Sequence, residues 1–209
     1  MRLFRPLSVF DSLYPEAVFR IKTTERRLLL TFDDGPDPDS TPFIIELLKQ
    51  SGTRAVFFCS GNKAERHPEL ISVLKLHGHI IGNHGYSHLN GWRTSISDYL
   101  SDTARADEYT SSALFRPPYG RITFSQYHAL KSKYRVFFWS LMPYDFDPSF
   151  GSMNSLKILK RKTAPGSIIV LHDSPSSCSR DILEEYIEFV ISRGFSFSEI
   201  MQEPPLLSP

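Results

Sequence analysis

Short apolar runs alternate along the chain with longer stretches in which apolar and polar residues are mixed. The runs are apolar at consecutive positions, which is typical of strands buried on both faces. The mixed stretches repeat apolar residues at the spacing of a helix with one buried face. We therefore predict strands at residues 27–32, 55–59, 79–82, 114–116, 135–140, 167–172 and 195–197.

Helix signals lie between these runs. Thr41-Pro42 is a start signal and Gly52 a stop signal for one helix. The longest mixed stretch predicts a single buried face, made of Ile96, Leu100, Thr103, Ala106, Tyr109 and Ala113. The predicted helices are residues 40–50, 68–77, 94–112, 123–131, 154–162 and 181–193.

The alternation of strand and helix decides the fold class. Such a pattern predicts an α/β fold with a parallel sheet covered by helices. Repeated units without a dinucleotide-binding glycine motif favour a (β/α) barrel over an open doubly wound sheet. We expect one domain at residues 25–200, preceded by a segment at residues 1–24 and followed by a loose tail at residues 201–209.

Composition narrows the class of ligand. The 209 residues are 41% hydrophobic and 22% charged, with a formal net charge of +1. These values argue against disorder and against a nucleic-acid-binding surface, so a neutral or mixed ligand fits better. Cys59 and Cys178 lie far apart in the sequence, and we assign them no disulfide and no redox role.

The start of the chain bears on location. No apolar stretch approaches the roughly 20 residues that a membrane span needs. Residues 1–20 interrupt their apolar positions with arginine, proline and aspartate, which resembles neither a signal peptide nor an anchor. We expect this segment to pack on the domain, the alternative being weak contact with a membrane surface. The sequence predicts a cytoplasmic protein; membrane association and export are the alternatives.

Polar residues follow several of the predicted strands. In a barrel of parallel strands the active site lies at the carboxyl ends, so residues there are candidates for chemistry. Unrelated surface charges would scatter over both ends, whereas these gather at one. They are Asp33-Asp34, Asn83-His84 with His88, Arg116, Asp145 and His172-Asp173.

His84 and His88 stand four residues apart, a spacing that suits one metal ion if the segment makes a helical turn. An isolated pair of this kind more often caps a loop or packs against aromatic residues. One carboxylate from Asp33-Asp34 would complete a set of two histidines and one carboxylate with positions left open. With that carboxylate added, we favour a metal site.

A metal ion in such a site would lower the pKa of bound water toward roughly 7 and polarise a carbonyl. The second aspartate of the pair could then take a proton from the water, and His172 could protonate a leaving amine or alkoxide. Three roles are open for Arg116. It could bind a phosphate or carboxylate, form a structural ion pair with a neighbouring helix, or hold the catalytic carboxylate ionised. The Pro-Pro-Tyr-Gly turn after it either presents a backbone N–H to an oxyanion or is only a rigid turn.

Five short motifs together carry a family resemblance. TFDDGP, NHGYSH, FRPPYG, WSLMPYDF and IIVLHD resemble, in this order, the motifs of the polysaccharide deacetylases, the NodB homology domain or carbohydrate esterase family 4. The resemblance covers residues 28–194. It implies a distorted, TIM-barrel-like (β/α) barrel, commonly seven-stranded. It also implies removal of acetyl groups from N- or O-acetylated sugars with a divalent metal, most often Zn²⁺, with Co²⁺, Ni²⁺, Fe²⁺ or Mn²⁺ as alternatives.

The resemblance assigns roles to the candidate residues. Asp33 would be the general base, and Asp34, His84 and His88 would hold the metal. Arg116 would orient and support Asp33, and the backbone N–H of Tyr119 would stabilise the oxyanion. His172 would be the general acid, kept protonated by Asp145, because a neighbouring carboxylate raises the pKa of a histidine.

Substrate contacts are assigned from position. Val170 precedes His172 by two residues and Phe146 follows Asp145, so both are candidates for the wall against the acetyl methyl group. Tyr86 and Trp92 are candidates for stacking on sugar rings. The family usually has tryptophan at Phe146 and Ser or Thr at Gly85. The first departure would alter the acetyl slot or the sugar-stacking surface, and the second would loosen the backbone beside His84 and alter the affinity for metal.

We therefore expect a metal-dependent deacetylase that acts on an acetylated sugar polymer or oligomer, such as peptidoglycan or a chitin-like chain. Neither nucleic acid nor a transmembrane segment is expected. One alternative is hydrolysis of another amide, such as a small cyclic amide or a lipid-linked amino sugar. The other is a carbohydrate-binding barrel without turnover.

Overall fold

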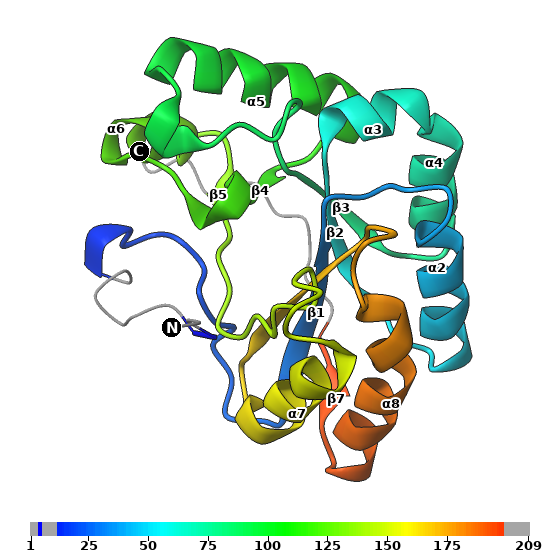
Figure 1. The fold of residues 1–209 in the computed structure, drawn as a ribbon. Helices are drawn as coiled ribbons and strands as arrows, with labels where there is room; N and C mark the ends of the chain where they lie inside the picture. The colour runs from blue at the N-terminus through cyan, green and yellow to red at the C-terminus, as the bar shows by residue number, and fades with distance from the viewer. Residues whose placement is uncertain (1–3, 6–11, 199–209) are drawn as a thin grey trace.

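Residues 4–5 and 12–198, which the computed structural model describes, form a parallel sheet curled into a partial barrel with helices on its outer side (Figure 1). The sheet order is β5-β4-β3-β2-β1-β6, and β7 pairs with the beginning of β1. This arrangement confirms the predicted α/β fold. The strands are β1 (Arg27–Asp33), β2 (Val56–Cys59), β3 (Ile80–Asn83), β4 (Leu114–Phe115), β5 (Arg135–Val136), β6 (Ile168–His172) and β7 (Ser196–Phe197).

The strand predicted at residues 135–140 is shorter in the structure, because β5 ends at Val136. Beyond it, Phe137 forms a bridge with Val18 of the N-terminal segment, and Leu141 forms a bridge with Ile169 of β6. The N–H of Val18 donates to Val136 O at 2.8 Å. The N-terminal segment and the chain after β5 thus take the place of a regular ladder between β5 and β6.

The predicted helices are all present, with ends that differ by a few residues. They are α2 (Thr41–Gln50), α4 (Pro68–Leu76), α5 (Ile96–Thr110), α6 (Phe124–Leu130), α7 (Ser152–Lys162) and α8 (Ser179–Ser192). The sequence did not predict α3 (Gly61–Arg66), because this short polar helix has no apolar stripe. A side chain on Gly61 would lie 2.7 Å from Ala106 Cα, so the glycine allows α3 to pack closely on α5.

The buried face of α5 differs from the predicted one. Tyr99, Thr103, Ala106 and Thr110 are buried, whereas Ile96 is 45% exposed. The two threonine hydroxyls donate to backbone carbonyls four residues earlier, which satisfies them inside the core. The predicted face is therefore confirmed at Thr103 and Ala106. Tyr99 and Thr110 are buried where Leu100 and Tyr109 were predicted, and those two residues are half-buried.

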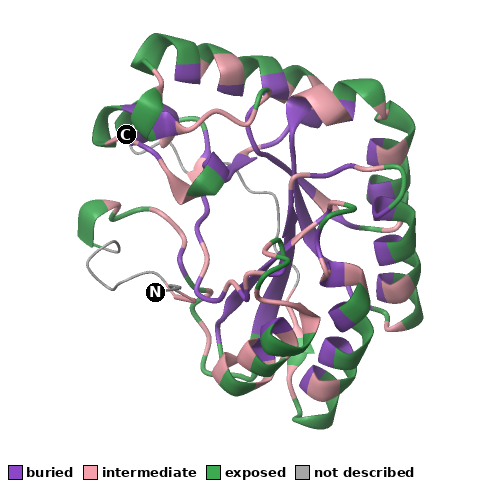
Figure 2. Ribbon diagram, in the orientation of Figure 1, coloured by how far each residue is buried: buried purple, intermediate pink, exposed green. Residues whose placement is uncertain are grey.

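Side chains of β1 alternate between two cores. Leu28, Leu30 and Phe32 pack toward the outer helices, while Leu29 joins a small cluster inside the barrel with Phe58 and others. Figure 2 shows the strands as the most continuously buried part of the fold. The alternation also places Thr31 and Asp33 on the inner side, so the strand delivers a carboxylate to the barrel mouth.

The predicted tail at residues 201–209 and most of residues 1–11 lie outside the described residues. Within the described part, every helix is too short or too polar to cross a bilayer.

Candidate active site

Five of the polar residues predicted at the strand ends line one cavity of 360 Å³ at the carboxyl ends of the strands. Its polar walls include Asp33, Asp34, His84, His88 and His172. These residues come from β1, from β3 and the loop after it, and from β6. Residues far apart in sequence therefore converge because parallel strands end on the same side of the barrel.

The two neighbouring aspartates point in different directions because the backbone turns between them. Asp33 is the last residue of β1 and is 5% exposed inside the barrel. Asp34 adopts φ 75°, a left-handed conformation that turns its side chain toward the two histidines. The next residue must be glycine, since a Cβ on Gly35 would lie 2.2 Å from Asp173 Oδ2.

Asp34, His84 and His88 form a set of possible metal ligands whose ligand atoms all lie within 4.8 Å of one another. Asp34 Oδ1 is 3.1 Å from His88 Nε2 and 3.5 Å from His84 Nε2. This oxygen atom is shielded from solvent, yet neither contact has the geometry of a hydrogen bond. Burial raises the pKa of Asp34, but the two imidazoles outweigh burial and hold it well below its usual range. An anionic oxygen between two ring nitrogens fits a shared divalent cation.

The orientation of His84 also suits a metal ligand. Its Nδ1–H donates to the carbonyl of Arg116 at 2.8 Å, which leaves Nε2 with a free lone pair facing Asp34.

The loop that follows His84 is held in place by hydrogen bonds from two sides. Asn83 Oδ1 accepts from the N–H of Gly85, and Asp102 on α5 accepts from the N–H groups of Tyr86 and Ser87.

Gly85 is thus held more firmly than we expected from its departure from the family pattern. It adopts φ 72°, which a residue with a side chain rarely adopts. A Cβ there would lie 3.0 Å from Asp102 Oδ2. Glycine therefore suits the backbone of this loop instead of loosening it.

Arg116 forms a buried ion pair with Asp33. Its Nη1 donates to Asp33 Oδ1 at 2.6 Å and to Thr31 Oγ1 at 2.8 Å, and its Nη2 donates to the Phe138 carbonyl at 3.0 Å. The guanidinium, fully buried, also lies over the ring of Phe58. The pair occupies one oxygen of Asp33, while the other lies on the side of His84, at 3.9 Å from its Nε2.

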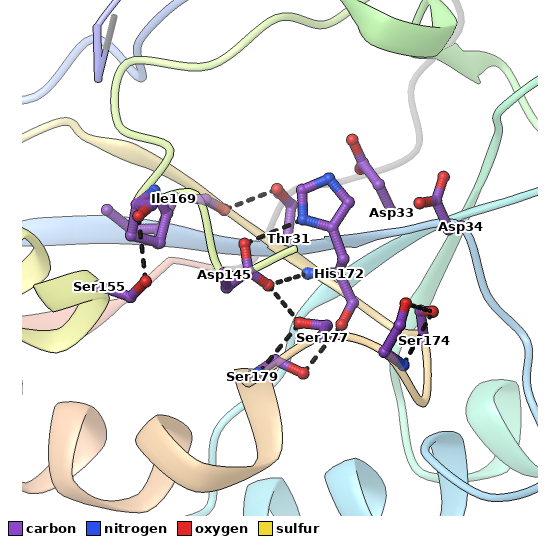
Figure 3. A network of polar contacts seen from close by, with 12 residues as sticks. Thr31, Asp33, Asp34, Asp145, Ser155, Ile169, His172, Ser174, Ser177 and Ser179 are labelled. Carbon is purple, nitrogen blue, oxygen red and sulfur yellow. Dashed lines mark hydrogen bonds and ion pairs between the residues drawn. The ribbon is translucent and has the colours of Figure 1, made fainter. Parts of the chain in front are cut away.

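His172 has its own carboxylate partner (Figure 3). Its Nδ1 donates to Asp145 Oδ1 at 3.0 Å, while Asp145 Oδ2 accepts from the His172 N–H and from Ser177 Oγ, both at 2.7 Å. Burial lowers the pKa of His172, but Asp145, with help from Asp34 and Asp33, outweighs it and raises this pKa to about 9. The imidazole is therefore protonated near neutral pH, with Nε2 as the nitrogen that can release a proton.

The turn after Arg116 brings backbone to the cavity. Tyr119 has φ 59° within η2 (Pro118–Gly120), and its ring lies 4.5 Å from that of His88. Gly120 follows with φ 64°, and a Cβ there would lie 2.4 Å from the Trp139 ring. The glycine thus allows Trp139 to approach the turn and line the cavity.

The apolar wall of the cavity differs in part from the prediction. Phe146 lines it, and its ring lies 4.8 Å from that of His172. Val170 does not line it, which corrects the prediction for this residue. Val170 faces the same side of β6 as His172 but is fully buried deeper in the barrel. Trp139 and Met142 line the cavity instead, and their place in the predicted WSLMPYDF motif after β5 was the signal available in the sequence.

The two predicted sugar-stacking residues also lie outside the cavity lining. The Tyr86 hydroxyl donates to Glu65, and the guanidinium of Arg105 lies 3.5 Å from the centre of the Tyr86 ring. The ring is therefore already covered by a side chain of the protein. Trp92 belongs to η1 (Gly91–Arg93) and is 59% exposed beside Arg121. Arg121, which the sequence analysis did not select, does line the cavity.

Comparison with known proteins points to one family. The sequence model of the polysaccharide deacetylase family matches residues 20–134. A peptidoglycan N-acetylglucosamine deacetylase of Bacillus cereus is 32% identical over 178 residues, which cover 80% of this chain and 64% of that protein. The chain thus spans slightly less than two thirds of that relative. A peptidoglycan N-acetylmuramic acid deacetylase of Bacillus subtilis is 28% identical over 198 residues, covering 88% of this chain and 74% of that protein.

A solved structure supports the same relationship. The crystal structure of a peptidoglycan N-acetylglucosamine deacetylase in complex with 4-naphthalen-1-yl-N-oxidanyl-benzamide superposes with a TM-score of 0.84 at 29% identity. The match covers 92% of this chain and 94% of that chain. Because the family model matches more than half of the sequence and the fold agrees over nearly its whole length, the chain belongs to the polysaccharide deacetylase family.

Proposed function

We propose that this protein is a metal-dependent hydrolase that removes the acetyl group from an N-acetylated sugar of peptidoglycan. The observation that carries the proposal is the convergence of Asp34, His84 and His88 with Asp33 and His172 in one cavity. The names of the relatives favour peptidoglycan as the substrate polymer. Imidazole and carboxylate ligands with open positions suit Zn²⁺, and Co²⁺, Ni²⁺, Fe²⁺ and Mn²⁺ accept the same donors.

A cation at these three ligands would polarise the acetyl carbonyl and lower the pKa of a bound water. The chain's own residues then accept and donate the protons of the reaction. Asp33 takes the proton of the attacking water through the oxygen that Arg116 does not occupy. Arg116 holds this carboxylate in place, and the backbone N–H of Tyr119 donates to the oxyanion as the new C–O bond forms.

The leaving group requires an acid. His172 donates the proton on Nε2 to the sugar nitrogen as the C–N bond breaks, which yields acetate and a free amine. Asp145 keeps the imidazole charged before this step and fixes its orientation through Nδ1. Phe146, Trp139 and Met142 offer an apolar surface for the acetyl methyl group.

Acetate release tests the proposal together with metal content. The purified protein is stripped with a chelator, reconstituted with single divalent metals and given peptidoglycan and chitin oligosaccharides. We expect one bound metal, acetate release only with metal, and an equal amount of new amine. The substitution Asp39→Asn, on an exposed residue near the site, serves as a control that retains full activity. Binding of oligosaccharide by metal-loaded protein without acetate release would instead favour a non-catalytic barrel.

A further inference from the structure

Arg121 is a cation at the cavity that has no acidic partner among the described residues. It is half-buried and lines the same cavity as Asp33 and Asp34. Among residues 4–5 and 12–198, no carboxylate forms an ion pair with its guanidinium and no side-chain hydrogen bond is made by it. The other arginine of the site, Arg116, by contrast has its charge paired with Asp33 and also donates to Thr31 and a carbonyl. The N–H donors of Arg121 are therefore available to a ligand.

Aromatic rings and backbone contacts hold Arg121 in place. Its guanidinium carbon lies 5.2 Å from the Trp92 ring centre and 6.0 Å from that of Tyr119. Trp92 is itself anchored, because its Nε1–H donates to the Ile122 carbonyl at 3.2 Å. The backbone carbonyl of Arg121 accepts from the N–H of Gly91, where a Cβ would lie only 2.5 Å away. The guanidinium is thus positioned without neutralisation of its charge.

We propose that Arg121 binds a carboxylate carried by the sugar substrate and selects for sugars that have one. This inference rests on the proposed function. In an N-acetylmuramic acid that carries no stem peptide, the lactyl group on O3 ends in a free carboxylate, and C3 is bonded to C2, which carries the acetamide. Asp33, Asp34 and Arg121 line the same cavity of 360 Å³, so an acetamide bound at the aspartates would bring such a carboxylate into the space that Arg121 lines. A guanidinium pairs with a carboxylate through two parallel hydrogen bonds.

The carboxylate has two sources in an alternating glycan. It belongs either to the sugar that loses its acetyl group or to the neighbouring sugar, when an N-acetylglucosamine is the one deacetylated. Relatives are named for each of these sugars. The chemistry at Arg121 is the same in both, and the position of the new amine distinguishes them.

The test uses three tetrasaccharides that differ in charge. The first alternates N-acetylglucosamine and N-acetylmuramic acid with free lactyl carboxylates, the second has the same carboxylates converted to methyl amides, and the third contains only N-acetylglucosamine. Metal-loaded wild-type protein is compared with Arg121→Met, Arg121→Lys and the control Arg93→Met, which alters an exposed arginine of η1 outside the cavity. Dissociation constants and acetate release are measured for each substrate, and mass spectrometry locates the amine.

We expect wild type to bind the free acid roughly tenfold to a hundredfold more tightly than its amide. Arg121→Met should abolish this preference through KM with kcat little changed, Arg121→Lys should restore part of it, and Arg93→Met should behave as wild type. Equal binding of acid and amide by wild type, or an equal loss on all three substrates in Arg121→Met, would overturn the proposal. The latter result would mean that Arg121 only supports Trp92.

The binding measurement separates this inference from the proposed function. If no substrate releases acetate but the preference for the free acid persists and is lost in Arg121→Met, the carboxylate site stands and the deacetylase proposal fails. If acetate is released without such a preference, the deacetylase proposal stands and the role of Arg121 is wrong.

Discussion

The two sides of the cavity satisfy their charges in different ways. On one side, Asp34, His84 and His88 bring ligand atoms together, and the buried Asp34 Oδ1 makes no hydrogen bond. On the other side, Asp33 is paired with Arg116 and His172 with Asp145 at hydrogen-bond distance. The first side is called incomplete because Asp34 Oδ1 lacks the partner that the proposed cation would supply, and the second is called complete because its charges are paired within the chain.

Two of the three residues on the first side also differ from the second side in burial and backbone, whereas the His84 side chain is only 3% exposed. The side chains of Asp34 and His88 are 30% and 27% exposed, and both residues have positive φ in loops. Arg116 and Asp145 are fully buried, and their partners Asp33 and His172 end strands. The difference teaches that the proposed metal ligands can lie on loops, where a cation would hold them together, while the proposed proton-transfer groups have partners built into the core.

The largest effect is expected on the incomplete side. His84→Ala removes one of three ligands and should lower both bound metal and acetate release, the latter by more than about a thousandfold. Metal analysis of the purified variant and an acetate assay measure the two effects. His128→Ala, on the exposed surface of α6, is the matched control. Full metal content in His84→Ala would show that the three residues are not a metal site.

Asp33→Asn should lower turnover without loss of bound metal, which distinguishes the two sides. It removes the base and leaves the buried Arg116 without its counter-charge, so turnover should fall by roughly 10² to 10⁴. Unfolding free energy should fall by about 3–5 kcal/mol, because a buried charge loses its partner. Bound metal should remain. Loss of metal in this variant would contradict the division of roles between Asp33 and Asp34.

Asp145→Asn should change the pH dependence on the complete side. The general acid must be protonated, so activity falls as pH rises through the pKa of His172. Removal of the Asp145 charge lowers that pKa from about 9, and a bound cation would lower it in both proteins. We therefore expect the alkaline limb of the pH–rate profile to move down by at least about one pH unit. Asp181→Asn, on exposed α8, is the control, and an unchanged limb would exclude His172 as the acid.

The smallest effect is expected for the backbone of the incomplete side. Gly85→Ala should destabilise the protein by about 1–2 kcal/mol, because a side chain is introduced at positive φ. Gly151→Ala is the matched control, since its φ is 78° and nothing lies within 4 Å of the added Cβ. Thermal unfolding and metal affinity are compared between the two. A weaker metal affinity in Gly85→Ala alone would assign an additional role to the Asp102 contact.

Most of the fold followed from local sequence patterns. Continuous apolar runs located β1–β4, β6 and β7, and turn residues located the longer helices, because burial and helix ends have strong local signals. The closure of the barrel did not follow, since it depends on Val18 and Leu141 meeting distant chain segments. The α3 helix was missed because it is short and polar and packs through Gly61.

The sequence selected most residues of the site, but the tertiary structure decided which of their side chains line the cavity. Val170 has the correct face of its strand and lies too deep, and Tyr86 is occupied by Arg105 and Glu65. Arg121 has no local signal, and its importance appears only because the turn after β4 brings it to the cavity. Depth within a barrel and coverage by distant neighbours are not properties of a local pattern.

The adjacent aspartates of TFDDGP show the division most clearly. The sequence by itself determined that two carboxylates end a buried strand at the mouth of a parallel barrel, because apolar runs and their polar ends are local features. Only the tertiary structure decided that Asp33 continues inward to Arg116 while Asp34 turns at φ 75° toward His84 and His88. The physical reason is that a carboxylate takes its role from the charges placed around it, and those come from other strands.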